Sequence, residues 1–594
     1  MNMTNAETDV LVIGGGAAGC SAALKAHEMG ARVLMVVKGK IGRSGATPLA
    51  AHLTSSRAIP GPYPLLSKLT RAFSALSDTL PLPLPARYRQ LVERVAGQDH
   101  YWLIDQDYVL DVGLWIIKEF PDLLERRGLY LLRNEEGKPF SPRGQSKWVA
   151  YKAGMSGYHF GESRRKEVLG SGIAVMEEAT AFSLLTGKSG DAIGAMVLDC
   201  RDGSLHAVKA RSVILATGHT NWLSKRATAT REMSANGLAM AARIGAELQN
   251  LEIQWFHASD SAFPDAWMRL HHFPNRLISG TTHQAVMFDS EGKAYMRNED
   301  YDISMPYTIQ MKRLYEQVKQ GKARWDGGYY TGYPEVDAET LTSLYYHPHF
   351  YPSLESDAPN QPMECGITWH MSAGGIRANV KTMETRVPGL FLAGPVGGHQ
   401  LGGINLATYD GLVAARSAVR RVRRKRGEDL DPRQIKACRE AIASHLSRAG
   451  EQGIRPIKVK NRIREIVWSN VMYAKTAKGL NEALGQLDDV RHSLLPRMRL
   501  NTRTMRYNSD LIEALDVEDM LDVVDMVIHA ALARQESRGP HFREDFPFTD
   551  NTNWLKHVVV TRTNGQVAIR LVPVRQKYAR PTPGITDYLA NPYA

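Results

Sequence analysis

The stretch from Asp9 to Gly19 constrains the fold more than any other part of the chain. It opens with four consecutive apolar residues, 10–13, which are typical of a strand buried on both faces of a parallel sheet. Glycines then follow at the spacing G-x-G-x-x-G, at Gly14, Gly16 and Gly19. The first glycine allows a tight turn, the second lets the backbone approach a pyrophosphate, and the third allows the next helix to pack closely against the strand.

The segments around this turn favour a dinucleotide site over an ordinary glycine-rich turn. A helix is expected from about Ala17, through Ala18, to Gly30, and its first N–H groups and positive dipole end would face the phosphates. A second apolar strand, residues 33–37, follows at the distance typical of a dinucleotide-binding unit. The sequence therefore predicts an α/β fold that begins with a dinucleotide-binding domain.

Length and composition set broad limits on the rest of the molecule. The 594 residues exceed one ordinary domain, so two or three domains are expected. An apolar fraction of 43% and a charged fraction of 23% are ordinary for a soluble globular protein. We find no apolar run long enough to span a bilayer and no signal-peptide pattern. The four scattered cysteines form no C-x-x-C pair, so we expect no metal site and a reducing, cytoplasmic location.

The chain carries a formal net charge of +12. Such a charge suits an acidic protein, an anionic substrate or a nucleic acid, but we find no nucleic-acid-binding motif and expect no nucleic acid partner. The densest basic run, residues 420–426, stands where a helix is expected to end. Its cations either complement the helix dipole as a solvated end or contact an acidic partner, and both interpretations stay open.

The loop after the second strand, residues 38–48, is rich in glycine and is expected to cross close to the cofactor. In a dinucleotide-binding unit the second strand usually ends in an acidic residue that holds a ribose hydroxyl. Val37 and Lys38 stand there instead, so the ribose must be held in another way. The candidate cofactor contacts in this loop are Lys38, Ser44, Gly45 and Ala46.

Two later segments repeat the pattern of a buried strand that ends in a glycine turn. Residues 174–216 contain short β-prone runs that predict a small sheet, and the last of these strands leads into a Thr-Gly turn. Residues 387–393 form another predicted strand, and a glycine-rich stretch then leads into a helix. These turns supply the candidate cofactor contacts Thr217, Gly218, Gly394, Gly403, Asn405 and Leu406.

The last third of the chain has a different pattern. From Asp431 onward apolar residues recur at intervals of three and four, which predicts a helix bundle. Residues 554–574 alternate in the manner of a β-hairpin about Asn564 and Gly565.

Several motifs occur in order along the chain and together carry a family resemblance. They are residues 14–19, Ala216-Thr217-Gly218, the helix at Gly237, Gln254-Trp255-Phe256-His257, residues 370–375, residues 388–394 and the late signature at 533–547. The ordered set resembles the flavoprotein subunits of succinate dehydrogenase and fumarate reductase, with L-aspartate oxidase and the alpha chain of adenylylsulfate reductase as relatives. The resemblance covers roughly residues 8–560.

The resemblance implies an α/β fold with a discontinuous, Rossmann-like FAD-binding domain, an inserted α+β capping domain and a helical C-terminal domain. The expected boundaries are 1–235 and 376–428 for the FAD-binding domain, 236–375 for the capping domain, 429–560 for the helical domain and 561–594 for a C-terminal hairpin and tail. In such proteins the substrate lies between the cap and the flavin, and hydride passes between flavin N5 and the substrate.

The resemblance also indicates candidate catalytic residues. His257 and His370 match two family histidines that bind a substrate carboxylate, on opposite sides of the expected cleft. Gln400 replaces a family arginine that clamps a substrate carboxylate, and residues 303–308 lack the arginine that delivers a proton in fumarate-reducing members. Tyr307, in that segment, is either a proton donor or a packed aromatic residue at a helix start. The loss of both arginines argues against succinate or fumarate as the substrate.

The positions expected around the flavin also depart from the family. The histidine that bonds FAD covalently in succinate dehydrogenase would fall near Gly45, so we expect non-covalent FAD. Val37 and Pro395 replace two usual polar contacts of FAD, although the glycine framework favours retention of the cofactor. His52 either approaches the flavin ring or has a role in the surface or core.

Three functions stay open from the sequence. The first is an FAD-dependent oxidoreductase that acts on a small molecule other than a C4 dicarboxylate and exchanges electrons with a separate protein. The second is an adenylylsulfate-reductase-like flavoprotein that acts with an iron–sulfur protein chain, and the third is a non-catalytic electron-transfer flavoprotein. The positive charge favours an acidic, ferredoxin-like iron–sulfur protein as the electron partner. Homo- and hetero-oligomers are both open.

Overall fold

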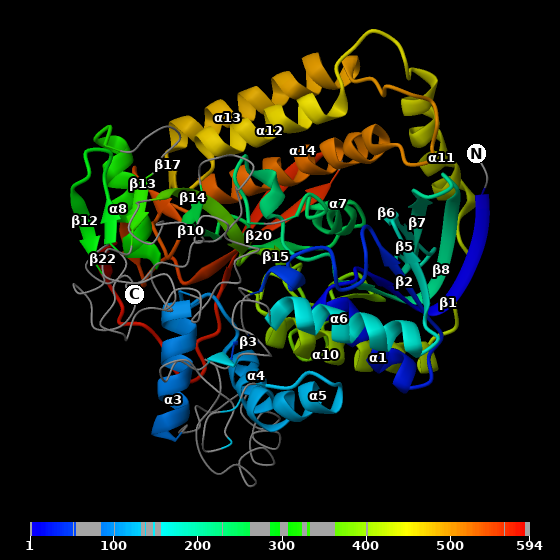
Figure 1. Cartoon of the computed structure of the whole chain (residues 1–594), viewed down its shortest axis with the longest axis horizontal. Helices are drawn as coiled ribbons and strands as arrows, with labels where there is room; N and C mark the ends of the chain where they lie inside the picture. Colours follow the sequence, from blue (N-terminus) through cyan, green and yellow to red (C-terminus); the bar gives the residue numbers. More distant parts are fainter. Residues whose placement is uncertain are drawn as a thin grey trace.

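The main sheet of the molecule has seven strands (Figure 1). The computed structural model describes residues 3–50, 53–54, 85–99, 101–131, 133, 137, 147–148, 156–228, 230–261, 286–297, 307–322, 329–332, 363–399, 402–563 and 565–588. The strand order is β5-β2-β1-β8-β7-β6, and β16 also pairs with β8. The strands are β1 (Met3–Ile13), β2 (Val33–Val37), β5 (Ala174–Glu177), β6 (Ala179–Thr186), β7 (Ala192–Asp199), β8 (Leu205–Leu215) and β16 (Leu390–Leu392).

The first predicted strand, β1, lies inside this sheet. Val10 stands opposite Val33 of β2 on one side and opposite Ser212 of β8 on the other, and both pairings are parallel. Val10 and Leu11 are fully buried, because layers of the fold cover both faces of a parallel sheet. β5 and β16 also pair in parallel, with β2 and β8, so the carboxyl ends of β5, β2, β1, β8 and β16 meet at one edge.

Three helices pack together beside the sheet: α1 (Ala17–Glu28), α6 (Ser156–Gly170) and α10 (Ile404–Arg424) (Figure 1). The predicted helices at Ala17 and near Asn405 are therefore confirmed. A glycine allows the close approach of α10 to α1, because a Cβ on Gly411 would lie 2.4 Å from the carbonyl oxygen of Ala18.

The β-prone runs of residues 174–216 do not form a small sheet of their own. β5 and β8 are strands of the main sheet, and the antiparallel strands β6 and β7 extend it. The reason is the long pairing of β8 with β1, which runs from Met3 opposite Leu205 to Ile13 opposite Leu215.

A second sheet has the order β10-β14-β13-β11-β12 and lies with α8 on the left of Figure 1. Its elements all fall within the expected capping domain, residues 236–375. They are β10 (Gln254–Ser261), β11 (Val286–Phe288), β12 (Ala294–Arg297), α8 (Tyr307–Lys319), β13 (Tyr329–Gly332) and β14 (Met363–Ser372). The division of the chain into domains stays a prediction.

The predicted C-terminal hairpin is confirmed. β20 (Lys556–Thr563) pairs antiparallel with β21 (Gln566–Pro573), so the expected boundary after residue 560 falls inside β20. The hairpin continues into a third sheet of order β15-β9-β20-β21, with β9 (Leu248–Gln249) and β15 (Gly375–Ile376).

The helical pattern after Asp431 is also confirmed. The helices are α11 (Pro432–Ser447), α12 (Pro456–Asn470), α13 (Ala477–Asp489) and α14 (Ser509–Ala533). Figure 1 shows α12, α13 and α14 side by side, and each of the three packs against the other two.

An acidic residue recurs at every third position of α14: Asp510, Glu513, Asp516, Asp519, Asp522 and Asp525. Cations from the segments around the helix pair with this row, namely Arg455, Lys460, Lys38, Arg243, Arg562 and Arg491. α14 thus joins α12, the loop after β2, α7 (Asn236–Arg243) and β20 through ion pairs, of which those of Asp516 are buried.

The remaining helices include α3 (Ala86–Glu93), α4 (Gln106–Lys118) and α5 (Phe120–Arg126). Asp105 caps α4, since its side chain accepts hydrogen bonds from the backbone N–H groups of Asp107 and Tyr108. In the part of the chain that the structure describes, no helix is both long enough and apolar enough to cross a bilayer.

Candidate functional site

The glycine turn stands at the carboxyl edge of the main sheet, between β1 and α1. Gly14 has a φ of +123°, and a Cβ there would lie 2.1 Å from the carbonyl oxygen of Ala216, at the end of the neighbouring strand. A Cβ on Gly19 would lie 2.0 Å from the carbonyl oxygen of Gly14. These contacts allow only glycine, and they bring the start of α1 against the strand as the G-x-G-x-x-G spacing predicts.

The first turn of α1 carries only small side chains at its start. Its N-cap residue, Gly16, makes no side-chain cap hydrogen bond, and Ala17 and Ala18 carry only small side chains. The backbone N–H of Ala17 donates to the hydroxyl oxygen of Thr47, at 3.0 Å, so the loop after β2 crosses beside the helix start. Such a helix N-terminus with a glycine turn before it fits a pyrophosphate.

The loop after β2 is folded on itself by its own polar groups. The hydroxyl of Ser44 accepts a hydrogen bond from the backbone N–H of Lys40 at 3.1 Å and donates to the Lys40 carbonyl at 2.8 Å. Gly45 has a φ of +75°, and a Cβ there would meet no atom within 4 Å, so open space lies beside it. Ala46 is exposed and precedes a short 3-10 turn, Thr47–Leu49.

Lys38 reaches away from the sheet edge into the C-terminal helices. Its ammonium donates to Asp516 of α14 at 2.6 Å, to Asn236 of α7 at 2.9 Å and to Ser234 at 3.1 Å. Burial alone would raise the pKa of Asp516, but the ammonium groups of Lys38 and Lys460 outweigh burial and lower this pKa to about 2. The residue in the usual ribose-binding position therefore links the cofactor edge to α14.

Thr217 and Gly218 follow β8 at the same edge. Gly218 has a φ of +77°, and the start of α7 packs on Thr217, since a Cβ on Gly237 would lie 2.0 Å from the Thr217 hydroxyl oxygen. The next residue, His219, is buried and accepts a hydrogen bond from the backbone N–H of Ser372 at 3.3 Å. Burial lowers the pKa of His219 to about 3, so its imidazole is neutral at physiological pH.

The loop after β16 is held by one buried carboxylate. Asp410 of α10 accepts a hydrogen bond from the backbone N–H of Gly394 at 3.1 Å, and its other oxygen accepts from the Tyr108 hydroxyl at 2.9 Å. The Nε2 of His399 lies 3.0 Å from Asp410 as well. A Cβ on Gly394 would lie 2.9 Å from the Cβ of Ala18, so this turn, α1 and α10 meet.

The start of α10 completes the edge. Gly403 has a φ of +117° and precedes the helix without a side-chain cap. Asn405 and Leu406 are buried in its first turn, whereas Gly403 is exposed. The sheet therefore brings the segments that carry the candidate cofactor residues to one edge, and the contact of each residue with a dinucleotide stays a prediction.

The candidate catalytic histidines lie on neighbouring strands. His257 of β10 pairs with Thr368 of β14, and His370 stands two residues further along β14. The two histidines therefore stand on neighbouring strands of one sheet, and their placement on opposite sides of a substrate cleft stays a prediction. Thr228 fixes the His370 ring, since its hydroxyl oxygen lies 2.7 Å from Nδ1.

The other substrate-side candidates are only partly described. Gln400 and His52 lie outside the described residues, as does the side chain of His257. Tyr307 is the first residue of α8, so the predicted helix start is confirmed, but its side chain also lies outside the described residues. Whether these groups act in catalysis stays a prediction.

Some residues of this region were missed by sequence reasoning. Thr47 lies within the glycine-rich loop, residues 38–48, that the sequence places close to the cofactor. Its hydroxyl group could have indicated a polar contact in that loop. Asp410 is the single acidic residue of α10, which is a weaker signal. His219 directly follows the Thr-Gly turn, and Asp516 gave no sign of its distant partner Lys38.

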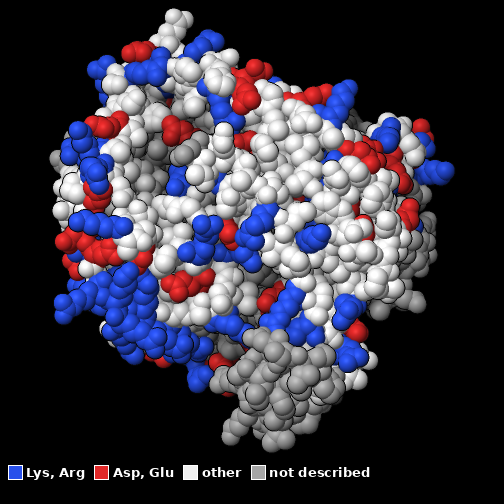
Figure 2. Space-filling model, turned by 180° about the vertical axis from the view of Figure 1, so that it is seen from behind, with Lys and Arg blue, Asp and Glu red and all other residues white. Residues whose placement is uncertain are grey.

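Charge is unevenly spread on the surface. The basic run at 420–426 ends α10, where Arg421 and Lys425 pair with Asp191 while Arg420, Arg423 and Arg424 are exposed. Figure 2 shows a dense group of Lys and Arg side chains at the lower left, on the side of the molecule where α10 ends. α10 has 21 residues, so its end lies about 30 Å from its start at the cofactor edge.

Within the described residues, no group of three or more His, Cys, Asp or Glu side chains is arranged to hold a metal ion. Cys20, Cys200 and Cys438 are free thiols. Burial raises the pKa of Cys20 to about 12, which keeps this thiol protonated and unreactive.

Known proteins match nearly the whole length of the chain. A model of the FAD binding domain matches residues 9–53 and 117–408, and a model of the fumarate reductase flavoprotein C-terminal region matches residues 460–588. The chain is 27% identical over 584 residues to a subunit of the fumarate reductase (CoM/CoB) of Methanothermobacter marburgensis, covering 94% of this chain and 97% of that protein. Succinate dehydrogenase flavoprotein subunits, such as that of Oryza sativa, and an L-aspartate oxidase of Streptomyces coelicolor also match.

Solved structures show the same fold. A mutant of the FrdA chain of E. coli quinol fumarate reductase aligns with a TM-score of 0.81 at 19% identity and covers 98% of this chain and 99% of its own. Adenylylsulfate reductase from Archaeoglobus fulgidus aligns with a TM-score of 0.75 at 17% identity and covers 98% of each chain.

Proposed function

Because this chain belongs to the succinate dehydrogenase and fumarate reductase flavoprotein family, we propose that it reduces or desaturates a small molecule other than succinate or fumarate. The chain is an FAD-dependent oxidoreductase of this family. The sequence lacks two arginines of the family, and the two described side chains nearest Gly402 carry no charge.

The residues at the sheet edge would hold FAD without a covalent bond. The glycine turn and the start of α1 would bind the pyrophosphate, and the loop around Gly45 would lie beside the flavin, where the family histidine is absent. FAD, when bound, supplies the hydride acceptor or donor of the reaction. Acid precipitation of the purified protein is expected to release the flavin into the supernatant, and flavin that stays in the pellet would contradict the non-covalent attachment.

The substrate proposal rests on the two described side chains nearest Gly402, neither of which carries a charge. A Cβ on Gly402 would lie 2.8 Å from Nε2 of His219 and 3.2 Å from the sulfur of Met371. The His219 imidazole is neutral, since its pKa is about 3, and the thioether of Met371 carries no charge. A glutamine two residues before this glycine offers hydrogen bonds to a carbonyl or amide, whereas a dicarboxylate needs cations to balance its two charges.

His370 would orient and polarise the substrate carbonyl. Thr228 fixes its ring, and the amide nitrogen of Asn221 donates to the backbone carbonyl of His370 at 2.7 Å, so both ring and backbone are held. A hydrogen bond from an imidazole to the substrate strengthens as negative charge develops on the accepting oxygen.

The test is a panel of oxidants mixed with the reduced, FAD-loaded protein without oxygen. Enoates and enones with one or no carboxylate are expected to reoxidise the flavin, and His370→Gln is expected to slow this at least tenfold. His206→Gln is the matched control, since His206 stands on β8 and contacts Thr4 of β1 and Ser204, away from the candidate site. A panel in which no compound reoxidises the flavin, or in which His370→Gln has the wild-type rate, would overturn the proposal in favour of a non-catalytic electron-transfer role.

A second candidate function is the reduction of a sulfur oxyanion or nucleotide sulfate. The missing proton-donor arginine in residues 303–308 favours it, because attack on sulfur needs no proton delivered to a carbon. Adenylylsulfate in the same panel separates the two functions, since only the sulfur-directed enzyme would pass two electrons from its reduced flavin to it and release sulfite and AMP.

The electron partner is proposed to be an acidic iron–sulfur protein. Several relatives are named as single subunits of a fumarate reductase or a succinate dehydrogenase, and the net charge of +12 suits an acidic partner. The basic run at the end of α10 would not form the docking surface, since it lies about 30 Å from the start of that helix. An acidic ferredoxin used as donor is expected to reduce the flavin more slowly as salt is raised; a rate indifferent to salt, with no iron in the co-purified material, contradicts the proposal.

A further inference from the structure

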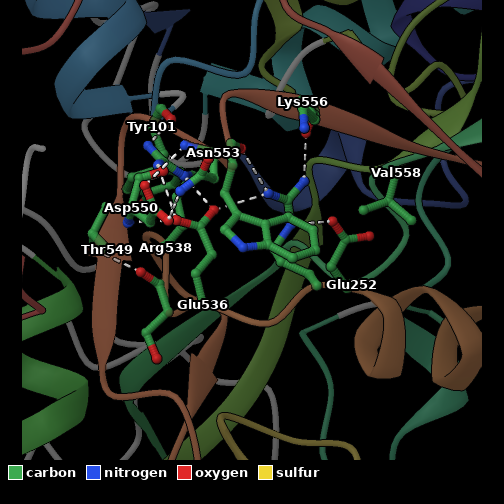
Figure 3. Close-up of polar contacts among 12 residues, drawn as sticks. Tyr101, Glu252, Glu536, Arg538, Thr549, Asp550, Asn553, Lys556 and Val558 are labelled. Carbon is green, nitrogen blue, oxygen red and sulfur yellow. Dashed lines mark hydrogen bonds and ion pairs between the residues drawn. The ribbon is translucent and has the colours of Figure 1, made fainter. Parts of the chain in front are cut away.

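Two buried arginines of the late signature share one carboxylate. Arg534 and Arg538 are fully buried, and Glu536 accepts from Nη1 of Arg534 at 2.9 Å and from Nε of Arg538 at 2.7 Å. Figure 3 shows Tyr101, Arg538 and Glu536 close together, and Glu252 on the other side of the cluster. Two buried cations need more acceptors than one carboxylate supplies, and each arginine finds them in a different part of the chain.

Arg534 holds the segment that leads into β10. Its Nε donates to Glu252 at 2.7 Å, and its Nη2 donates to the carbonyl of Lys556 at 2.8 Å. Glu252 is fully buried and stands two residues before the first residue of β10. The position of β10 is thereby tied to the hairpin strand β20.

Arg538 holds a second segment, at Tyr101. Its Nη1 donates to the backbone carbonyl of Tyr101 at 3.3 Å. Tyr101 and Trp102 have φ values of 54° and 63°, a left-handed conformation that bulky residues keep only where their surroundings impose it. The Tyr101 ring lies flat against the backbone of Gly539, where a Cβ would come within 2.3 Å of the ring.

Tyr101 in turn reaches the candidate substrate site through Trp255. The indole Nε1 of Trp255 donates to the Tyr101 hydroxyl oxygen at 2.9 Å. The Trp255 ring lies 5.8 Å, centroid to centroid, from the ring of His370. Trp255 stands on β10 opposite Met371 and Phe256 stands opposite Trp369, so the register of the two strands shifts at His370, beside the Trp255 ring.

We propose that Tyr101 is a positioning residue for His370, acting through Trp255 and held in a strained conformation by Arg538 and Gly539. The late signature would thus set the orientation of a histidine that lies more than 160 residues earlier in the chain. The proposal rests on the proposed function only through the role given to His370.

The test compares Tyr101→Phe with a matched variant in the full-length, FAD-loaded protein. Tyr101→Phe removes the acceptor of the Trp255 indole N–H and keeps the ring on Gly539. Tyr578→Phe is the control, because it removes a hydroxyl that donates to Asp107 at 2.7 Å. NMR spectra report the indole N–H of Trp255 and the ring C–H of His370, and the variants Trp255→Phe and His370→Gln assign them.

Tyr101→Phe is expected to shift both the Trp255 and the His370 resonances, and Tyr578→Phe is expected to leave both in place. A Trp255 resonance that moves while His370 stays, or two unmoved resonances, would overturn the proposal. If Tyr101→Phe does not fold, Trp255→Phe takes its place in the test. Loss of the indole donor and of the indole ring must by itself move the His370 resonance. Coupled resonances in a protein whose His370→Gln variant keeps full activity would support the positioning and refute the proposed function.

Discussion

At the scale of single residues, the position of Gly14 requires both a positive φ and the absence of a side chain. Gly14→Ala is expected to reduce bound flavin to less than about one tenth of the wild-type level, because its Cβ would lie 2.1 Å from the Ala216 carbonyl oxygen. Flavin content after desalting, from the ratio of visible to protein absorbance, measures this.

Gly30→Ala is the matched control for that variant. Gly30 also has a positive φ, +85°, but a Cβ there would meet no atom within 4 Å. This variant therefore introduces only the backbone strain, about 1–2 kcal/mol, and is expected to keep its flavin. Equal flavin loss in the two variants would show that strain, and not the contact with β8, explains the effect.

Also at the scale of single residues, Lys475 is expected to make the free energy of unfolding depend on pH. Burial and the nearby Arg543 guanidinium lower the pKa of Lys475 from 10.5 to about 7. Between these values the unfolded chain binds a proton that the folded chain lacks, so the free energy of unfolding rises with pH from about 7 to about 10 and this gain is lost as pH falls. Relative to Lys475→Met, the wild type should gain on the order of 2 kcal/mol between pH 7 and 9.

Urea unfolding at pH 7, 8 and 9 measures that difference. Lys478→Met is the control, because the Lys478 side chain is 87% exposed and its replacement should not change the pH dependence. A difference between the wild type and Lys475→Met that stays constant over this range would contradict a neutral Lys475 in the folded protein.

At the scale of elements, an ion pair joins α14 to the loop after β2, which lies at the cofactor edge. Asp516→Asn would leave the ammonium groups of Lys38 and Lys460 buried beside a neutral amide, and we expect a loss of about 3–5 kcal/mol of stability. Glu518→Gln, on the same helix, breaks a half-exposed pair with His445 and should cost less than about 1 kcal/mol. Denaturant unfolding of both variants measures this, and equal costs would show that the buried pairs do not join α14 to the edge.

Elements with a strong local pattern could be predicted from the sequence. β1, β2, α1, α10, the C-terminal helices and the hairpin at Gly565 all follow from apolar periodicity and glycine placement. The sheet that contains β5 to β8 was misjudged, because the edge on which a strand pairs depends on segments more than 100 residues away. For the same reason the neighbouring positions of β10 and β14 could not be predicted, and with them the arrangement of His257 and His370.

The candidate site likewise has features that could be predicted from the sequence and features that could not. The cofactor edge could be predicted because parallel strands place their carboxyl ends together, as Gly14, Thr217 and Gly394 do. The buried groups that hold this edge could not, since Asp410 and Asp516 are recognised only through partners distant in the chain.

At the scale of the whole molecule, the fold is that of the family while the substrate side differs from it. The main sheet, α1 and α10 form the edge that carries the candidate cofactor residues, while ion pairs join α14 to the loop after β2 and the late signature to the segment before β10. The two described side chains nearest Gly402, those of His219 and Met371, are uncharged, and the sequence has Gln400 where the family has an arginine. The central claim is therefore that this flavoprotein does not act on a C4 dicarboxylate.

Anaerobic mixing of the reduced, FAD-loaded protein with fumarate tests this claim most directly, since fumarate reductases and succinate dehydrogenases are among the relatives. We predict that the visible absorbance of the oxidised flavin returns no faster with fumarate than with buffer. Rapid return of the absorbance, with one succinate formed per flavin, would contradict the account.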